Sequence, residues 1–146
     1  MGCDIHIMTE IQNKNGDWES AEIYNKNNRL IPLYDDRNYD LFAVLADVRN
    51  YNDIPFIDSP REIPDDCSVE TYKEYRSWGA DSHSASYLTL REIQEFAEEN
   101  TSIKDIVQPI IIRMIQRVEM YSYETGVYNF SKDMPDRVRI VFWFDN

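Results

Sequence analysis

The segment C-D-I-H-I-M-T-E-I-Q, residues 3–12, has the two-residue repeat that is typical of a β-strand. One face of this strand is apolar and consists of Ile5, Ile7 and Ile11, with Thr9 between them. Asp4 and His6 lie on the other face, because side chains two positions apart in a strand point the same way. The first strand therefore aims a carboxylate and an imidazole in one direction.

A turn signal follows this strand directly. Asn15-Gly16, within N-K-N-G-D, is the strongest short hairpin dipeptide because both residues accept a positive φ. We therefore predict a β-hairpin over residues 3–24, with the returning strand at residues 18–24.

The last apolar run, R-V-R-I-V-F-W-F at residues 137–144, is apolar on both faces in its second half. Such a run predicts a central strand that is covered on both sides. With the N-terminal hairpin it indicates a small, mainly antiparallel sheet.

Four helical segments lie between these strands. Leu41, Phe42, Leu45 and Val48 recur at helical spacing and predict a short amphipathic helix over residues 39–48. Ser68 is a candidate cap for a helix that continues to about Trp78. T-L-R-E at residues 89–92 matches the capping box and opens a helix to about Glu99. A longer helical stretch begins near Ser102, where Pro109 is expected to kink it or to start a second helix.

Two segments are expected to be loops. Residues 50–66 contain Pro55, Pro60 and Pro64, and long loops in small domains are often functional. Residues 79–86 are small and polar, so we expect a loop that carries Asp81 and His83. The whole pattern predicts a single α+β domain over residues 1–146, with about four helices packed on the sheet.

Composition narrows the class of protein. The chain has 146 residues, 42% hydrophobic side chains and a net charge of −12. A nucleic-acid binder needs a clustered cationic surface, which this charge disfavours. Cys3 and Cys67 make no disulfide framework, and the N-terminus lacks both a signal peptide and the Ser or Thr that acylation after Gly2 requires. We therefore expect a cytoplasmic protein that does not bind membranes.

The repeated Asp-x-His motif is the main chemical signal. The only two histidines each follow an aspartate by two positions, in Asp4-Ile-His6 and Asp81-Ser-His83. Two such pairs brought together would supply four ligands for Zn or Mn, which could activate water for hydrolysis. We therefore name Asp4, His6, Asp81 and His83 as candidate metal ligands and catalytic residues. In the alternative interpretation, the aspartates only orient hydrogen-bonded histidines.

A second set of residues suits an anionic ligand. Arg37 and Arg49 flank the helix predicted over residues 39–48 and could clamp a phosphate. The aromatic residues that could stack a base are Tyr39, Tyr51, Tyr75, Trp78 and Tyr87. Of these we name Tyr39 and Trp78, with the two arginines, as candidate ligand-binding residues. Alternatively, the arginines pair with neighbouring aspartates and the aromatic side chains belong to the core.

Four stretches resemble a known family. They are M-G-C-D-I-H at residues 1–6, R-N-Y-D-L-F-A-V-L-A-D-V-R at 37–49, I-P-D-D-C-S at 63–68 and D-S-H-S-A-S-Y-L at 81–88. They are similar to small proteins found mainly in bacteriophage and prophage genomes, over roughly the first two thirds of the chain. That family often has H-S-H-S-W where this chain has His83-Ser-Ala-Ser-Tyr87, so Ala85 replaces a second histidine. The resemblance implies a phage accessory protein that interferes with host enzymes, immune signals or nucleotide pools.

Three functions follow from these observations. The first is a metal-binding accessory protein that hydrolyses a phosphorylated or nucleotide-like substrate. The second is a non-catalytic binder that sequesters a small nucleotide signal with its arginines and aromatic side chains. The third is an acidic inhibitor of a host protein that mimics nucleic acid. The expected partner is therefore a small anionic ligand or a host protein, and the sequence leaves enzymatic activity and oligomeric state open.

Overall fold

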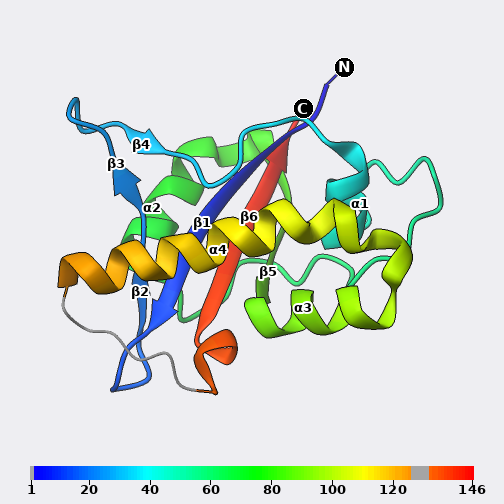
Figure 1. The fold of residues 1–146 in the computed structure, drawn as a ribbon. Coiled ribbons are helices and arrows are strands. Elements are labelled where there is room, and N and C mark those ends of the chain that lie inside the picture. Colours follow the sequence, from blue (N-terminus) through cyan, green and yellow to red (C-terminus); the bar gives the residue numbers. More distant parts are fainter. Residues whose placement is uncertain (1, 126–131) are drawn as a thin grey trace.

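A four-stranded antiparallel sheet forms the centre of the structure, with the strand order β2-β1-β6-β5 (Figure 1). The computed structural model describes residues 2–125 and 132–146. The strands are β1 (Asp4–Gln12), β2 (Trp18–Ser20), β5 (Ser82–Thr89) and β6 (Val138–Asp145). Four α-helices pack around this sheet, so the predicted α+β class is confirmed.

The C-terminal strand β6 lies between β1 and β5, as its apolar sequence predicted. Its residues from Val138 to Phe144 are all buried. Ile140, Phe142 and Phe144 join the larger core, whereas Trp143 lies in a smaller core with Met8 and Ala85. The strand is therefore covered on both faces, which is the reason that both of its faces are apolar.

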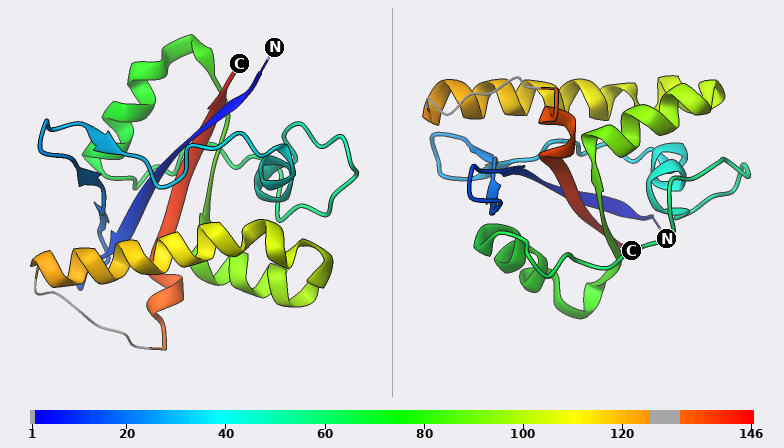
Figure 2. Two further views of the ribbon diagram at one scale, coloured as in Figure 1. Left: turned by 45° about the horizontal axis from the view of Figure 1, so that its top comes forward. Right: turned by 90° about the horizontal axis from the view of Figure 1, so that it is seen from below.

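The helices divide between the two faces of the sheet. Figure 2 shows α3 (Leu90–Glu99) and α4 (Lys104–Thr125) on one side and α2 (Val69–Trp78) on the other. The buried side of α1 (Tyr39–Ala46) joins the core beneath α3 and α4. Tyr75 and Trp78 of α2 pack against the smaller core.

The helix starts follow the predicted capping residues. Ser68 accepts a hydrogen bond from the Thr71 amide, and Thr89 and Glu92 form the reciprocal capping box of α3. The helix α1 was expected to be amphipathic, but residues Leu41 to Ala46 are all buried. Pro109 neither starts nor ends a helix, because α4 runs without a break from Lys104.

The returning strand of the N-terminal hairpin is shorter than predicted. The turn is confirmed, because Gly16 has a φ of 86° and its amide donates to the Asn13 carbonyl. However, β2 ends at Ser20, and β3 (Ile23–Tyr24) pairs with β4 (Leu30–Ile31) in a separate sheet. The break lies at Glu22, whose side chain turns inward to accept from the Thr9 amide and from Arg117.

The prediction of a loop over residues 79–86 is also wrong. A short 3-10 helix, η1 (Gly79–Asp81), leads directly into β5, where Ser82 pairs with Asp145 and His83 with Phe144. These small side chains carry no strand pattern of their own. They form a strand because β6 offers a free edge there, which tertiary pairing satisfies.

Within the described residues, no helix combines the length and apolar character that crossing a membrane requires. Two short 3-10 helices complete the secondary structure, η2 (Thr101–Ile103) before α4 and η3 (Met134–Asp136) before β6.

A buried ion pair joins the sheet to α2. Arg139 of β6 lies opposite Glu10 of β1, and its guanidinium donates to Glu10 at 2.8 Å. The other oxygen of Glu10 accepts from the Ser68 amide at 2.7 Å and the Thr71 hydroxyl at 2.8 Å. The ring of Trp18 covers the guanidinium carbon of Arg139 at 3.9 Å.

Replacing Arg139 by Met tests this pair, because it leaves the Glu10 carboxylate buried without a cation. We expect the free energy of unfolding to fall by about 3–5 kcal/mol in urea denaturation at pH 7. Arg91→Met is the matched control, since the pair of Arg91 with Asp136 is exposed. The loss of stability in this control should be much smaller, because an exposed ion pair contributes little. Equal losses in the two variants would contradict the structural role of the buried pair.

Candidate functional site

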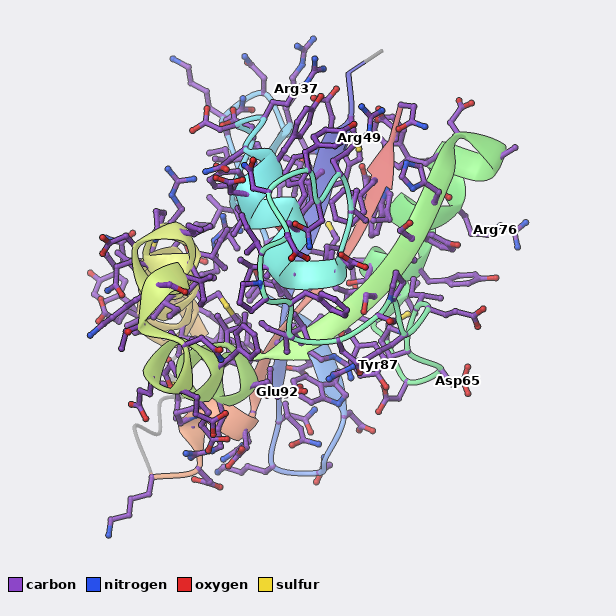
Figure 3. The ribbon with its side chains drawn as sticks, turned by 90° about the vertical axis from the view of Figure 1, so that its right-hand side faces the viewer. Arg37, Arg49, Asp65, Arg76, Tyr87 and Glu92 are labelled. Carbon is purple, nitrogen blue, oxygen red and sulfur yellow. The ribbon has the colours of Figure 1, made fainter. Side chains whose placement is uncertain are left out.

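Polar side chains gather at the end of the sheet where β1 begins and β6 ends. The antiparallel register sets Asp4 beside Asp145, and Figure 3 shows Arg37 and Arg49 at the same end of the molecule. We call this group the sheet-end cluster; it consists of Cys3, Asp4, His6, Arg37, Tyr39, Arg49, Tyr51, His83, Asp145 and Asn146. It contains three of the four predicted metal ligands and three of the four predicted ligand-binding residues.

His6 lies on the face of the sheet that α2 covers. Its Nε2 atom is 2.6 Å from Asp145 Oδ2, and its ring stacks on Trp78 with a centroid separation of 3.9 Å. Trp78, predicted to stack a base, therefore holds this imidazole instead. Asp4 points to the same face, as predicted, but its carboxylate accepts from Arg37 at 2.9 Å.

His83 lies on the opposite face. Its ring stacks on Phe144, and its Nε2 atom is 3.1 Å from Asn146 Oδ1. Its Nδ1 atom is 3.0 Å from the Ser84 hydroxyl. Asp81 is exposed in η1, and within the part of the chain that the structure describes it forms no hydrogen bond or ion pair with His83.

The two Asp-x-His pairs are thus not brought together, because neighbouring positions of β6 point to opposite faces. His6 pairs with Trp143 on one face of the sheet, and His83 pairs with Phe144 on the other. In residues 2–125 and 132–146, no group of three or more His, Cys, Asp or Glu side chains could hold a metal ion. The roles of Asp4, His6, Asp81 and His83 as Zn or Mn ligands stay predictions from the sequence.

Arg49 is the cation of the cluster that has no acidic partner. Its guanidinium donates to the Tyr51 hydroxyl at 3.2 Å and to Asn146 Oδ1 at 3.4 Å, and it lies 5.6 Å from the centre of the Tyr39 ring. Among the described residues it forms no ion pair. The hydrogen bond with Tyr51 raises the pKa of Arg49, so the side chain keeps its charge.

Arg37 and Tyr39 lie against the first residues of the chain. The Cys3 amide donates to the Tyr39 hydroxyl at 3.1 Å. Arg37 packs so closely on Gly2 that a Cβ atom there would be 1.9 Å from the guanidinium. Burial raises the pKa of the Cys3 thiol, and the charges of Arg49 and Arg37 oppose that shift. Both arginines therefore act on the same buried thiol.

Sequence reasoning missed Asp145 and Asn146 and left Cys3 out of the candidate ligands. Asp145 and Asn146 directly follow the apolar strand, and pairing that strand against the first one would have placed them beside Asp4. Tyr51 stands in the expected loop, with 70% of its surface exposed. The sequence named Tyr51 as one of five aromatic side chains that could stack a base, without choosing it over the others.

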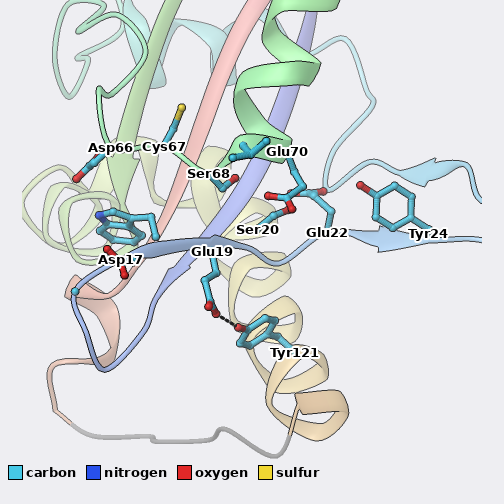
Figure 4. Close-up of a pocket in the computed structure, with 13 residues that line it drawn as sticks. Asp17, Glu19, Ser20, Glu22, Tyr24, Asp66, Cys67, Ser68, Glu70 and Tyr121 are labelled. Atoms are coloured by element: carbon cyan, nitrogen blue, oxygen red, sulfur yellow. Dashed lines mark hydrogen bonds between the residues drawn. The ribbon is translucent and has the colours of Figure 1, made fainter.

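A separate acidic groove lies beside β2 and the start of α2 (Figure 4). Its volume is about 710 Å³. Its carboxylates are Asp17, Glu19, Glu22, Asp66 and Glu70, and its aromatic side chains are Trp18, Tyr24 and Tyr121. A hydrogen bond joins Glu19 to Tyr121 across it. This groove was not predicted, because its residues come from distant parts of the chain.

Comparisons of the chain with protein-family models, with curated proteins and with solved structures find no match. The resemblance to phage proteins therefore stays a prediction from the sequence.

The groove contains one carboxyl with a strongly shifted pKa. Burial raises the pKa of Glu22 from its usual 4.5 to about 7, and the Thr9 amide and Arg117 offset this only in part. Between these two values the folded protein binds more protons at Glu22 than the unfolded chain does. Its contribution to stability is therefore present at low pH and is lost as the pH rises to about 7.

Glu22→Gln should remove this dependence on pH. For the wild type we expect Glu22 to contribute a fall in the free energy of unfolding of up to about 1 kcal/mol per pH unit between pH 5 and 7. Urea denaturation across this range measures the slope. Glu19→Gln is the control, because hydrogen bonds from Tyr121 and Asn13 lower the pKa of Glu19 and it titrates below this range. Equal slopes for the wild type and Glu22→Gln would contradict the assignment.

Proposed function

We propose that this protein binds a small phosphorylated or nucleotide-like ligand at the sheet-end cluster. The single observation that carries the proposal is the guanidinium of Arg49, which no carboxylate neutralises among the described residues. Arg61, Arg117 and Arg139 have acidic partners, whereas Arg29, Arg76, Arg113 and Arg137 share with Arg49 the lack of an ion pair among the described residues. Arg49 is the cation of this kind that lies in the sheet-end cluster, beside the half-exposed Arg37. Arg49 remains available for an anion from outside the protein.

The guanidinium of Arg49 is also held in place before any ligand binds. Its donors already engage Tyr51 and Asn146, and its backbone has a φ of 51°, which is unusual for a residue other than glycine. A guanidinium that is ordered in advance loses less entropy on binding a phosphate. The second cation, Arg37, is half exposed and is paired only with Asp4 at the surface.

Aromatic side chains suit the other half of a nucleotide. Tyr51 is 70% exposed beside Arg49, and its ring meets Tyr39 edge to face at 6.2 Å. An exposed ring next to a phosphate contact provides a surface on which a base can stack. This combination supports the second function named from the sequence, binding of a small nucleotide signal. In a phage-encoded protein, such binding would remove the signal from the host.

Isothermal titration calorimetry with AMP tests the proposal. We expect Arg49→Gln to weaken AMP binding roughly tenfold or more, because the substitution removes charge-assisted hydrogen bonds to the phosphate. Tyr51→Ala should weaken binding of AMP but not of inorganic phosphate, since only AMP has a base to stack.

The matched control is Arg76→Gln. Arg76 on α2 donates to the Tyr72 hydroxyl at 3.1 Å and lies over that ring at 5.7 Å, as Arg49 lies by its tyrosines. Figure 3 shows Arg76 away from Arg37 and Arg49. The two variants change net charge equally, so a non-specific charge effect would weaken AMP binding equally in both. We expect only Arg49→Gln to weaken it, because only Arg49 lies in the sheet-end cluster. Equal losses, or no AMP binding by the wild type, would refute the proposal.

A further inference from the structure

A serine, a histidine and an asparagine form a continuous hydrogen-bonded chain within the sheet-end cluster and β5. The Ser84 hydroxyl is 3.0 Å from His83 Nδ1, and His83 Nε2 is 3.1 Å from Asn146 Oδ1. The two ring nitrogens of one imidazole therefore join a hydroxyl on one side to an amide on the other. This is the order of groups in a nucleophile, its base and the residue that orients the base.

The partners of Asn146 decide which ring nitrogen carries the proton. Asn146 Oδ1 can only accept, and Arg49 Nη2 also donates to it at 3.4 Å. Because Arg49 has no acceptor atom, the amide must present its oxygen to both groups. His83 Nε2 must then donate, so in the neutral ring Nδ1 is the acceptor of the Ser84 hydroxyl proton.

The backbone conformation at Ser84 differs from that of a regular strand. The register of β5 shifts between His83 and Ser86, and Ser84 has a φ of 55°. A β-bulge with a non-glycine residue in the left-handed region redirects a side chain and is often found beside functional sites. Ser84 therefore does not follow the regular alternation of the strand.

The other serines of β5 show that this contact is particular to Ser84. The Ser82 hydroxyl donates to the Gly79 carbonyl at 2.9 Å, and the Ser86 hydroxyl accepts from the Arg61 amide at 3.0 Å. Of these three similar side chains, only Ser84 contacts an imidazole. Ser84 and His83 are both partly exposed, so a substrate can reach them.

We propose that Ser84 is the nucleophile of an ester-hydrolase site, with His83 as its base and Asn146 as the positioning residue. The substrate class is a carboxylic ester that also carries an anionic group. This inference rests on the proposed function, because Arg49 would hold that anionic group beside the chain of hydrogen bonds.

The reaction balances with water as the only co-reactant. Ser84 Oγ forms a bond to the ester carbonyl carbon while His83 Nδ1 takes the hydroxyl proton. The bond from carbon to the alcohol oxygen then breaks, and the alcohol leaves with the proton from Nδ1. Water attacks the acyl-Ser84, Nδ1 takes its proton and returns it to Ser84 Oγ, and the carboxylic acid is released.

Labelling with an uncharged alkyl fluorophosphonate tests the nucleophile directly, since Ser84 Oγ would form a bond to phosphorus as fluoride leaves. Peptide mass spectrometry should place the adduct on Ser84 in the wild type. Ser84→Ala should give no adduct. His83→Ala should be labelled at least roughly 100-fold more slowly than the wild type, because it lacks the general base. Ser82→Ala is the matched control and should label at the wild-type rate.

The role of Asn146 has a separate test. Asn146→Ala should slow labelling, and Asn146→Asp should restore it, because a carboxylate oxygen accepts the same hydrogen bond from Nε2. A merely structural role would not show this rescue.

An unlabelled Ser84 in the folded wild type, or labelling that His83→Ala leaves unchanged, would overturn the proposal. Circular dichroism checks that each variant is folded. If His83→Ala does not fold, the absence of an adduct in Ser84→Ala still tests whether Ser84 is the nucleophile. The uncharged reagent needs no bound anion, so labelling and the calorimetric titration with AMP can fail independently.

Discussion

The buried pair of Glu10 and Arg139 is the interaction on which the rest of the structure depends. It joins the first strand to the last one and, through Ser68 and Thr71, fixes the start of α2 on the same face. Both side chains are almost fully buried, so the loss of Arg139 would leave the Glu10 carboxylate buried without a cation. The loss of Glu10 would leave Arg139 with only its second partner, the exposed Asp66. A sheet with these side chains opposite each other can therefore form in only one register.

That register also places the candidate site. With Glu10 opposite Arg139, the antiparallel pairing brings Asp4 beside Asp145 six positions along β1. The start and the end of the described chain then meet at one end of the sheet, where the helix α1 adds Tyr39 and the following turn adds Arg49. A structural ion pair at one end of the strands thus determines which polar groups gather at the other end.

Local patterns predicted most of the fold. Alternation in residues 3–12, the Asn15-Gly16 turn, the caps at Ser68 and Thr89 and the apolar last strand all depend on neighbours within a few positions, and each was confirmed. Two predictions failed where distant segments decide the outcome. The strand β5 needs the edge of β6, and the break at Glu22 needs the buried Arg117.

The sequence by itself determined the class of the fold, the acidic character of the chain and the residue types available for chemistry, because composition and periodicity are local properties. It also named Arg37, Tyr39 and Arg49, which the structure places in one cluster. Only the tertiary structure decided how the histidines are used. Because Trp143 and Phe144 point to opposite faces of one strand, His6 and His83 are separated by the sheet, and each is joined to a polar residue at the end of that strand.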